Sequence, residues 1–567
     1  MMFRILGFLI AGSALAAAQS PRAWPIPLTA CKAMGGRAEA MCGSYEVFEN
    51  RAARTGRKIK LNLMVFPALD AAPLPDPLFP LAGGPGEAAV QTYQGLAMQY
   101  HQKRDVVLVD QRGTGGSNLL TCNWKEDVAS SFARIVPIDE LRNCRKQLEK
   151  TADLRLYTTS IAMDDLDEVR AALGYEQINV YGGSYGTTAG LEYLRRHGDH
   201  VRTLTLLAVV PPSFRVPLPF PHTVQRSLEG LFSRCDADPG CHAAFPKLRD
   251  EFRAVLDRLA RAPVKVSFTS PPAIKDPVEV TLSAEMFGDF LRRVLYTVPG
   301  MSLLPMAIDG AWHGDFEMFA RLCYELSVRT NPTIPYGMYY SILCNESFPF
   351  ITERERALMT KDTYIGDYRL GQQRAACAGW PDARVPASFV EAVKSDRPVL
   401  LVSGELDPAA QPEYAAEAAK SLFRSRHIVV RNGSHGVGGP CIAGIVAHFI
   451  DAGSTNGLDA SCVDAIKLAP FRLHDPKHSG MTTKAMAEYA GTYETAPGVN
   501  YVFRAEGSIM MVQFPGAPGE VAMYPMSENQ IYMLGGQGEV EFLRDPDGAV
   551  KRLVVHLSER ELPMTRK

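Results

Sequence analysis

The apolar positions of the chain fall into short runs that alternate with amphipathic segments. Residues 105–110 (DVVLVD) and 178–181 (INVY) are apolar runs of the kind that forms strands buried on both faces. Residues 161–173 lie between them and carry apolar side chains at helical spacing. Further apolar runs occur at 201–210 and 397–402. Strands that alternate with helices need crossover connections, so the sequence predicts an α/β fold with a mainly parallel sheet.

Two other patterns interrupt and follow this alternation. Between residues 211 and 386 the pattern predicts helical segments broken by prolines, for example at 246–260 and 284–294. An insertion between two core strands would lie over the strand ends, where open α/β sheets bind ligands, so we interpret this part as a cap. Beyond a Pro/His/Gly-containing linker, short strand-like segments with turn signals such as Asp547-Gly548 predict a small antiparallel β domain.

These patterns divide the chain into five parts. A division is expected, because single hydrophobic cores stop growing well below 567 residues. The parts are a signal peptide, a first core segment, a mainly helical cap, a second core segment and a C-terminal β domain, at residues 1–18, 19–212, 213–386, 387–469 and 483–567.

The N-terminus has the three parts of a secretory signal. Arg4 precedes an apolar stretch at residues 5–15, and small residues follow at 16–18. A membrane anchor is the alternative, but the stretch is shorter than the ~20 apolar residues that a spanning helix needs, and no later segment reaches that length. We therefore expect cleavage and a secreted or periplasmic protein without a stable membrane anchor.

Composition and cysteine usage agree with export. The net charge is −2, which provides no basic excess for binding nucleic acid. Ten of the eleven cysteines form near-neighbour pairs without CxxC spacing, so we expect neither a structural metal nor a cofactor. The sequence does not fix the connectivity, but five local disulfides are the simplest framework, and Cys323 is left over. The five pairs are Cys31 with Cys42, Cys122 with Cys144, Cys235 with Cys241, Cys344 with Cys377, and Cys441 with Cys462.

The segment Gly182-x-Ser184-x-Gly186 has the form of a nucleophile elbow. It lies between an apolar strand and a helix, and its glycines allow a sharp turn that exposes the serine hydroxyl. An ordinary Gly/Ser turn that caps a helix is the alternative. The strand-turn-helix setting favours Ser184 as a nucleophile.

A serine nucleophile needs a general base and a group that orients the base. His435 lies in a glycine-flanked loop after the strand predicted at 427–431, and no other histidine is so placed. Asp407 follows the strand that ends near Gly404, and Glu405 is its rival for the orienting carboxylate. We favour Asp407 because it lies further into the loop. The order Ser, Asp, His is that of the α/β-hydrolase triad.

The tetrahedral intermediate of acyl transfer also needs amide donors. The backbone N–H of Tyr185 follows the nucleophile, and Gly84 in the loop at 83–86 is the second candidate, although this loop could be an ordinary tight turn. Arg112 is expected to pair with a loop carboxylate and brace the floor of the site, whereas the acidic run at 164–170 is expected to be the solvated face of a helix.

Together these motifs resemble those of the proline iminopeptidase and tripeptidyl aminopeptidase group of α/β-hydrolase serine peptidases. The resemblance covers roughly residues 31 to 465. Ala82 departs from the iminopeptidase pattern, which often has a histidine before the glycines, and this puts proline selectivity in question. The C-terminal β domain lies outside the minimal family pattern. The matching stretches are Cys42-Gly43, 81–86 (LAGGPG), 110–117 (DQRGTGGS), 179–187 (NVYGGSYGT), 403–407, 433–436, and Cys441 with Cys462.

The resemblance implies an α/β-hydrolase fold and an exopeptidase that acts at free peptide N-termini, with acidic cap residues that receive the substrate ammonium. Glu346 is the candidate for that role, and a surface carboxylate is the alternative. The expected function is therefore a secreted or periplasmic serine hydrolase, an aminopeptidase that forms an acyl-enzyme with peptide substrates. A carboxylesterase would use the same triad. A non-catalytic binding protein is least favoured, because all triad and oxyanion positions are filled.

Overall fold

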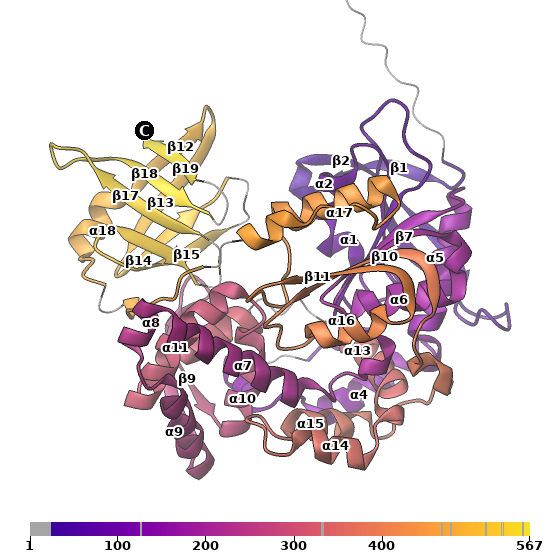
Figure 1. The fold of residues 1–567 in the computed structure, drawn as a ribbon, viewed down its shortest axis with the longest axis horizontal. Helices are drawn as coiled ribbons and strands as arrows, with labels where there is room; N and C mark the ends of the chain where they lie inside the picture. The colour runs from indigo at the N-terminus through magenta and orange to yellow at the C-terminus, as the bar shows by residue number, and fades with distance from the viewer. Residues whose placement is uncertain are drawn as a thin grey trace, which may run out of the picture.

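The structure is a computed structural model. It describes residues 24–567 except 125–126, 330–333, 467–468, 477–478, 516, 518, 535, 537 and 558–560. The signal peptide predicted at residues 1–18 lies outside the described residues. Figure 1 shows a core sheet with its helices, a mainly helical layer below it and a small β-barrel at one side.

The core is a nine-stranded sheet in the order β1-β2-β3-β5-β4-β6-β7-β10-β11. The strands from β5 to β11 in this order are parallel, and β1, β2 and β3 add an antiparallel edge. The predicted α/β class with a mainly parallel sheet is confirmed, whereas the pattern did not predict β1. The strands are β1 (Leu28–Ala33), β2 (Ala38–Phe48), β3 (Lys58–Phe66), β4 (Leu78–Leu81), β5 (Val106–Val109), β6 (Ile178–Gly183), β7 (Val201–Leu207), β10 (Ser395–Gly404) and β11 (Leu422–Val430).

Helices cover both faces of this sheet, which explains its continuous apolar runs. Val107 in β5 packs with helices α5, α6 and α16, and its neighbour Leu108 packs with α2 and α17 on the other face. Successive strand residues point to opposite faces, so a doubly covered strand favours apolar side chains at consecutive positions. The helices of the core segments are α1 (Ala89–Thr92), α2 (Gln94–Tyr100), α3 (Val128–Ala133), α4 (Ile138–Leu148), α5 (Thr159–Ala172), α6 (Tyr185–His197), α16 (Pro412–Ala419) and α17 (Pro440–Ala452), of which α3 and α4 pack with the cap.

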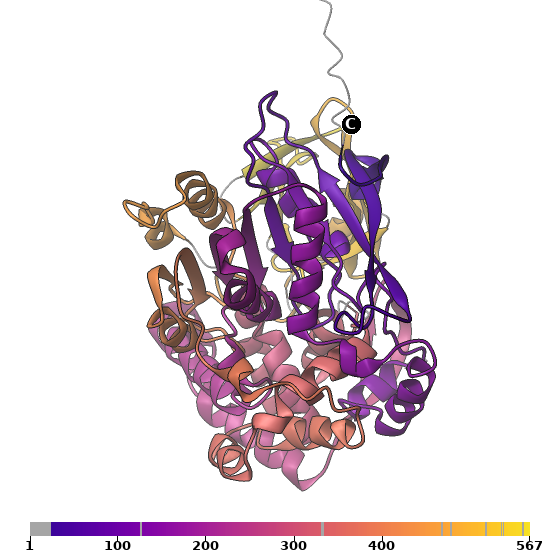
Figure 2. The same cartoon turned by 90° about the vertical axis from the view of Figure 1, so that its right-hand side faces the viewer.

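The predicted cap is inserted between β7 and β10 and lies below the sheet in both views (Figure 1, Figure 2). Helix α10 has the predicted bounds. The two-stranded hairpin of β8 and β9 was not predicted, because its alternating strands were interpreted as part of a helical region. The cap elements are α7 (Phe220–Ala237), α8 (Pro239–Ala244), α9 (Leu248–Arg261), β8 (Val264–Ser270), β9 (Ile274–Leu282), α10 (Ala284–Val294), α11 (Val298–His313), α12 (Glu317–Cys323), α13 (Tyr336–Glu346), α14 (Glu353–Thr360) and α15 (Tyr368–Cys377).

The C-terminal β domain is a closed antiparallel barrel that follows helix α18 (Thr483–Tyr489). Its interior is filled by side chains such as Phe503 and Phe542. Its outer side chains Met511 and Tyr524 pack with the cap, so the barrel supports the cap from the side. The strands are β12 (Gly491–Ala496), β13 (Val499–Glu506), β14 (Ile509–Gln513), β15 (Glu520–Pro525), β16 (Gln530–Met533), β17 (Glu539–Arg544), β18 (Val550–His556) and β19 (Glu561–Arg566).

Disulfides link elements of both the core and the cap, and a buried ion pair joins elements of the core. All five expected cysteine pairs are joined, and Cys323 is free and buried. Arg112 is fully buried and makes two hydrogen bonds to Asp165, at 2.6 and 2.9 Å. The expectations for these two residues need correction: the partner of Arg112 lies on helix α5 and not on a loop, and Asp165, in the run expected to be solvated, is only 2% exposed.

The structure contains no described helix that combines the length and the apolar character needed to cross a membrane.

Candidate active site

Ser184 lies on a sharp turn between β6 and α6. Its φ and ψ angles are 54° and −122°, a conformation that a non-glycine residue adopts only where its surroundings impose it. A Cβ atom on Gly186 would lie 2.0 Å from the carbonyl oxygen of Leu81, and one on Gly182 would lie 2.3 Å from that of Gly186. Only glycine fits at these two positions, and the turn places Ser184 in the wall of a cavity.

His435 connects Ser184 with Asp407. Its Nε2 lies 3.0 Å from Ser184 Oγ, and its Nδ1 lies 2.8 Å from Asp407 Oδ2. A carboxylate only accepts hydrogen bonds, so Nδ1 carries the imidazole proton and Nε2 is left to accept the serine hydroxyl. The sheet explains the convergence: Ser184, Asp407 and His435 follow the parallel strands β6, β10 and β11, whose carboxyl ends meet at one edge.

The two rival carboxylates have different roles in the structure. Asp407 is fully buried, and its Oδ1 accepts hydrogen bonds from the backbone N–H groups of Ala409 and Ala410 at 2.7 and 2.8 Å. Glu405 is exposed, and its Oε2 accepts a hydrogen bond from the backbone N–H of Asn432 at 2.7 Å. Asp407 therefore orients the imidazole, whereas Glu405 braces the loop that carries it.

The two expected amide donors both adjoin Ser184. Tyr185 is the first residue of α6, where backbone N–H groups have no partner inside the helix and form its positive end. A Cβ atom on Gly83 would lie 3.4 Å from Ser184 Cβ, so the loop at 83–86 passes close to the serine. Gly84 has a φ of 107° and lines the same cavity as Ser184. Gly84 and Tyr185 therefore remain our candidates for the amide donors of an oxyanion hole.

Glu346 does not contact the cavity, which corrects the expected role in binding a substrate ammonium. Its side chain is 3% exposed and is no part of the cavity wall. Its two oxygens accept hydrogen bonds from the backbone N–H and the Oγ1 hydroxyl of Thr159, at 2.5 and 2.6 Å. Thr159 Oγ1 in turn lies 2.7 Å from the hydroxyl of Tyr185. Glu346 is therefore connected to the Tyr185 side chain through Thr159 and helps to hold it in place. Burial raises the pKa of Glu346 to about 8.

The raised pKa of Glu346 makes a prediction for stability. The folded state binds this proton more tightly than the unfolded chain does, so the stabilisation is complete below the ordinary pKa of 4.5 and is lost as the pH rises through about 8. Between pH 5 and pH 8 the free energy of unfolding of the wild type should therefore fall. In the Glu346→Gln variant this fall should be smaller by on the order of 3 kcal/mol.

Urea unfolding at both pH values would measure this difference. The exposed Glu279 on β9 provides the control, because Glu279→Gln removes a carboxyl group that pairs with Lys265 at the surface. Equal pH dependence in wild type and Glu346→Gln would contradict the prediction.

Ser184 opens into a cavity of about 510 Å³ between the core and the cap, and two carboxylates line it. Asp289 is held by two hydrogen bonds from Arg369, at 2.5 and 2.7 Å. Glu87 accepts a hydrogen bond from the backbone N–H of Gly83 at 3.2 Å, and burial raises its pKa. Among the described residues Glu87 makes no direct ion pair, although the Arg293 charge lowers its pKa, so Glu87 is the lining carboxylate open to a cationic group close to Ser184.

Several lining residues that bear on the chemistry were not predicted as site residues. Glu87 directly follows the Gly83–Gly86 loop, and this position in the motif could have identified it. Arg292 and Arg293 on α10, and Tyr296 just after it, also line the cavity. The Tyr296 ring packs against the His435 imidazole with 4.5 Å between centroids. The helix was predictable from its sequence, but the face that it turns toward Ser184 depends on cap packing.

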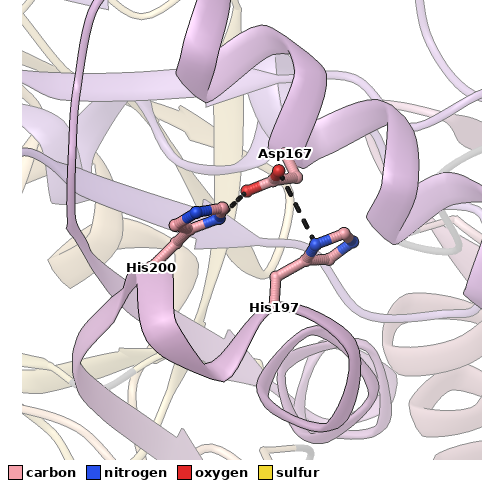
Figure 3. A group of neighbouring side chains, drawn as sticks. All are labelled: Asp167, His197 and His200. Atoms are coloured by element: carbon pink, nitrogen blue, oxygen red, sulfur yellow. Dashed lines mark hydrogen bonds and ion pairs between the residues drawn. The ribbon is translucent and has the colours of Figure 1, made fainter.

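A group of potential metal ligands lies away from this cavity, between α5 and the end of α6 (Figure 3). Asp167 Oδ1 lies 2.7 Å from His200 Nδ1, and Asp167 Oδ2 lies 3.6 Å from His197 Nδ1. Arg170 Nε also contacts Asp167 Oδ1, at 2.7 Å, and Tyr193 donates a hydrogen bond to the same oxygen. The guanidinium occupies the place of a cation, so the group is better explained as an ion-pair network that joins two helices.

Comparison with known proteins gives matches in both core segments. Residues 76–261 match the family described as alpha/beta hydrolase fold, and residues 362–462 match the family described as TAP-like protein. The tripeptidyl aminopeptidase of Streptomyces coelicolor is 26% identical over 424 residues, which cover 67% of this chain and 75% of that protein. Serine protease Hip1 of Mycobacterium tuberculosis is 25% identical over 498 residues, which cover 77% of this chain and 91% of that protein.

Solved structures also match the chain. The proline iminopeptidase of Mycobacterium smegmatis aligns with 72% of this chain and 98% of its own, with 19% identity and a TM-score of 0.36.

Proposed function

We propose that this chain, an α/β-hydrolase related to the tripeptidyl aminopeptidase and proline iminopeptidase serine peptidases, is an exported aminopeptidase that releases residues or short peptides from peptide N-termini. Its relatives support a serine hydrolase. The observation that carries the proposal is the unbroken set of contacts from Asp407 through His435 to Ser184, at 2.8 and 3.0 Å, beside a carboxylate-lined cavity.

In the proposed reaction, Ser184 Oγ attacks the carbonyl carbon of the scissile peptide bond while His435 Nε2 takes the hydroxyl proton. The negative charge that forms on the carbonyl oxygen is stabilised by the backbone N–H groups of Gly84 and Tyr185. The imidazolium then gives its proton to the leaving amine, and an acyl-enzyme remains. Water attacks the ester by the same route, with His435 again acting as the base, and regenerates Ser184.

The proposed preference for free N-termini depends on a cationic group finding a carboxylate near the serine. Glu87 replaces Glu346 as our candidate, because it lines the cavity and directly follows the Gly83–Gly86 loop that passes Ser184. Burial raises the pKa of Glu87 although the nearby Arg293 charge opposes the shift, and an ammonium group next to Glu87 would stabilise the charged carboxylate further. The cavity is bounded by the cap, which favours the end of a peptide over the middle of a long chain.

Export is supported by the five disulfides of the structure, since disulfides persist in oxidising compartments. The signal-like N-terminal segment points the same way.

Blocking the substrate amine tests the exopeptidase proposal. We expect kcat/KM for aminoacyl and short peptidyl arylamides to fall by at least roughly tenfold when the amine is acetylated, because Glu87 then has no charge to bind. Glu87→Gln should reduce kcat/KM for the free-amine substrate and so bring it closer to kcat/KM for the acetylated substrate. Equal turnover of free and acetylated substrates would refute the exopeptidase proposal, and faster turnover of simple esters than of peptides would favour the alternative, a carboxylesterase with the same triad.

A further inference from the structure

The cavity next to Ser184 has a cationic wall on helix α10. Arg292 and Arg293 both line the cavity, and among the described residues neither makes an ion pair. The other lining arginines are neutralised: Arg369 pairs with Asp289 at 2.5 Å, and Arg134 pairs with Glu140 at 2.9 Å. Arg292 and Arg293 are therefore outside any direct ion pair of the described residues, although Asp289 attracts both charges and Glu87 attracts that of Arg293.

Arg292 is the more unusual of the two. Its side chain is 4% exposed, and its guanidinium lies over the rings of Phe220 and Tyr296, at 4.9 and 5.3 Å from their centroids. Nη1 donates a hydrogen bond to the Tyr296 hydroxyl at 2.8 Å, while Nε is buried without a hydrogen-bond partner. Burial and the neighbouring Arg369 lower the pKa of Arg292 to about 10. A buried charge without a counter-ion is costly, and a ligand that supplies the counter-ion removes the cost.

This charge lies one side chain away from the reacting groups. The Tyr296 ring that lies under the Arg292 guanidinium also packs against the His435 imidazole, with 4.5 Å between the ring centroids. The lining charges outside any direct ion pair of the described residues are Arg292, Arg293 and Glu87, and Glu87 lies close enough to Arg293 for their charges to attract. A substrate that brings only an ammonium group would compete with Arg293 for Glu87 and would give neither arginine a direct counter-ion.

We propose that Arg292 and Arg293 bind a carboxylate of the substrate, so that the enzyme prefers peptides with an acidic group close to the scissile bond. This inference rests on the proposed function and adds a substrate class to it. The carboxylate has two possible sources, an Asp or Glu side chain at the N-terminus or the free C-terminal carboxylate of a very short peptide. Both present the same planar group that a guanidinium binds well.

Matched substrate pairs separate the two sources. One pair is the glutamyl and the glutaminyl arylamide, which differ only in side-chain charge. The other is dialanine with a free or an amidated C-terminus. We expect kcat/KM to favour the charged member of one pair by roughly tenfold to a hundredfold, the range that charge-assisted hydrogen bonds support. The favoured pair identifies the source.

Variants then connect the preference to the arginines. Arg292→Met should bring the ratio of the favoured pair close to one, and Arg292→Lys should retain part of it. Arg293→Met, at a less buried position of the same helix, should lower the ratio as well and gives a second test if Arg292→Met does not fold. Arg134→Met is the matched control: its charge is already balanced by Glu140, so the ratio should stay as in wild type.

The outcomes distinguish this inference from the proposed function. Ratios near one in both wild-type pairs, together with hydrolysis that requires a free amine, would overturn the carboxylate inference and leave the aminopeptidase intact. In a second outcome, the acetylated substrates are cleaved as fast as the free ones, but the glutamyl substrate is still strongly preferred over the glutaminyl one. This outcome would refute the aminopeptidase and retain the anion site. A preference that survives in both Arg292→Met and Arg293→Met would also overturn the inference.

Discussion

Ser184→Ala is expected to lower kcat/KM by roughly four to six orders of magnitude, because the variant has no nucleophile for an acyl-enzyme. Steady-state hydrolysis of a free-amine arylamide would measure the loss.

Asp407→Asn should lower kcat/KM by about four orders of magnitude, because an amide at this position favours the wrong tautomer of His435.

Glu405→Gln is the matched control for Asp407→Asn, since Glu405 belongs to the same loop and its side chain accepts a hydrogen bond from the backbone N–H of Asn432. It should change kcat/KM far less than Asp407→Asn does. The assignment of the orienting carboxylate would be wrong if the Glu405 variant lost activity and the Asp407 variant kept it.

Arg112→Met is expected to destabilise the folded protein by about 3–5 kcal/mol, the range found when one partner of a buried ion pair is removed. Asp165 would lose its two contacts with the guanidinium, and the carbonyl oxygens of Glu49 and Leu156, which accept hydrogen bonds at 2.9 and 2.8 Å, would lose their donor. A shift of the urea unfolding midpoint would report the loss.

The surface variant Arg142→Met is the control for this change. Arg142 pairs with Asp139 at 3.0 Å where both side chains are exposed, so its loss should alter stability by less than about 1 kcal/mol. Equal effects of the two substitutions would contradict a stabilising role for the buried pair.

Much of the fold was predictable because strands buried on both faces leave continuous apolar runs. β5 (Val106–Val109) and β6 are apolar along almost their whole length, and a helical pattern between them requires a crossover. The hairpin of β8 and β9 was missed, since it is one small piece within a helical region and its alternation is short. Closure of the C-terminal barrel was also not predictable, because it depends on pairing β12 with β19, far apart in sequence.

The convergence of Ser184, Asp407 and His435 was predictable for a related reason. Each follows a strand of the parallel sheet, so strand adjacency alone brings the side chains to one edge. Glu346 was misplaced because its surroundings come from a distant segment: Thr159 lies 187 residues away in sequence. The cap arginines were missed for a similar reason, since the orientation of α10 depends on packing against the rest of the cap.

The central claim is that Ser184 is a nucleophile activated by His435. Reaction with a serine-directed fluorophosphonate, followed by mass spectrometry of the digested protein, measures this directly. We expect one adduct, on the peptide that contains Ser184, and much slower labelling of the folded His435→Ala variant. An intact protein that takes up no label at Ser184, or one that labels equally fast without the imidazole, would contradict the account.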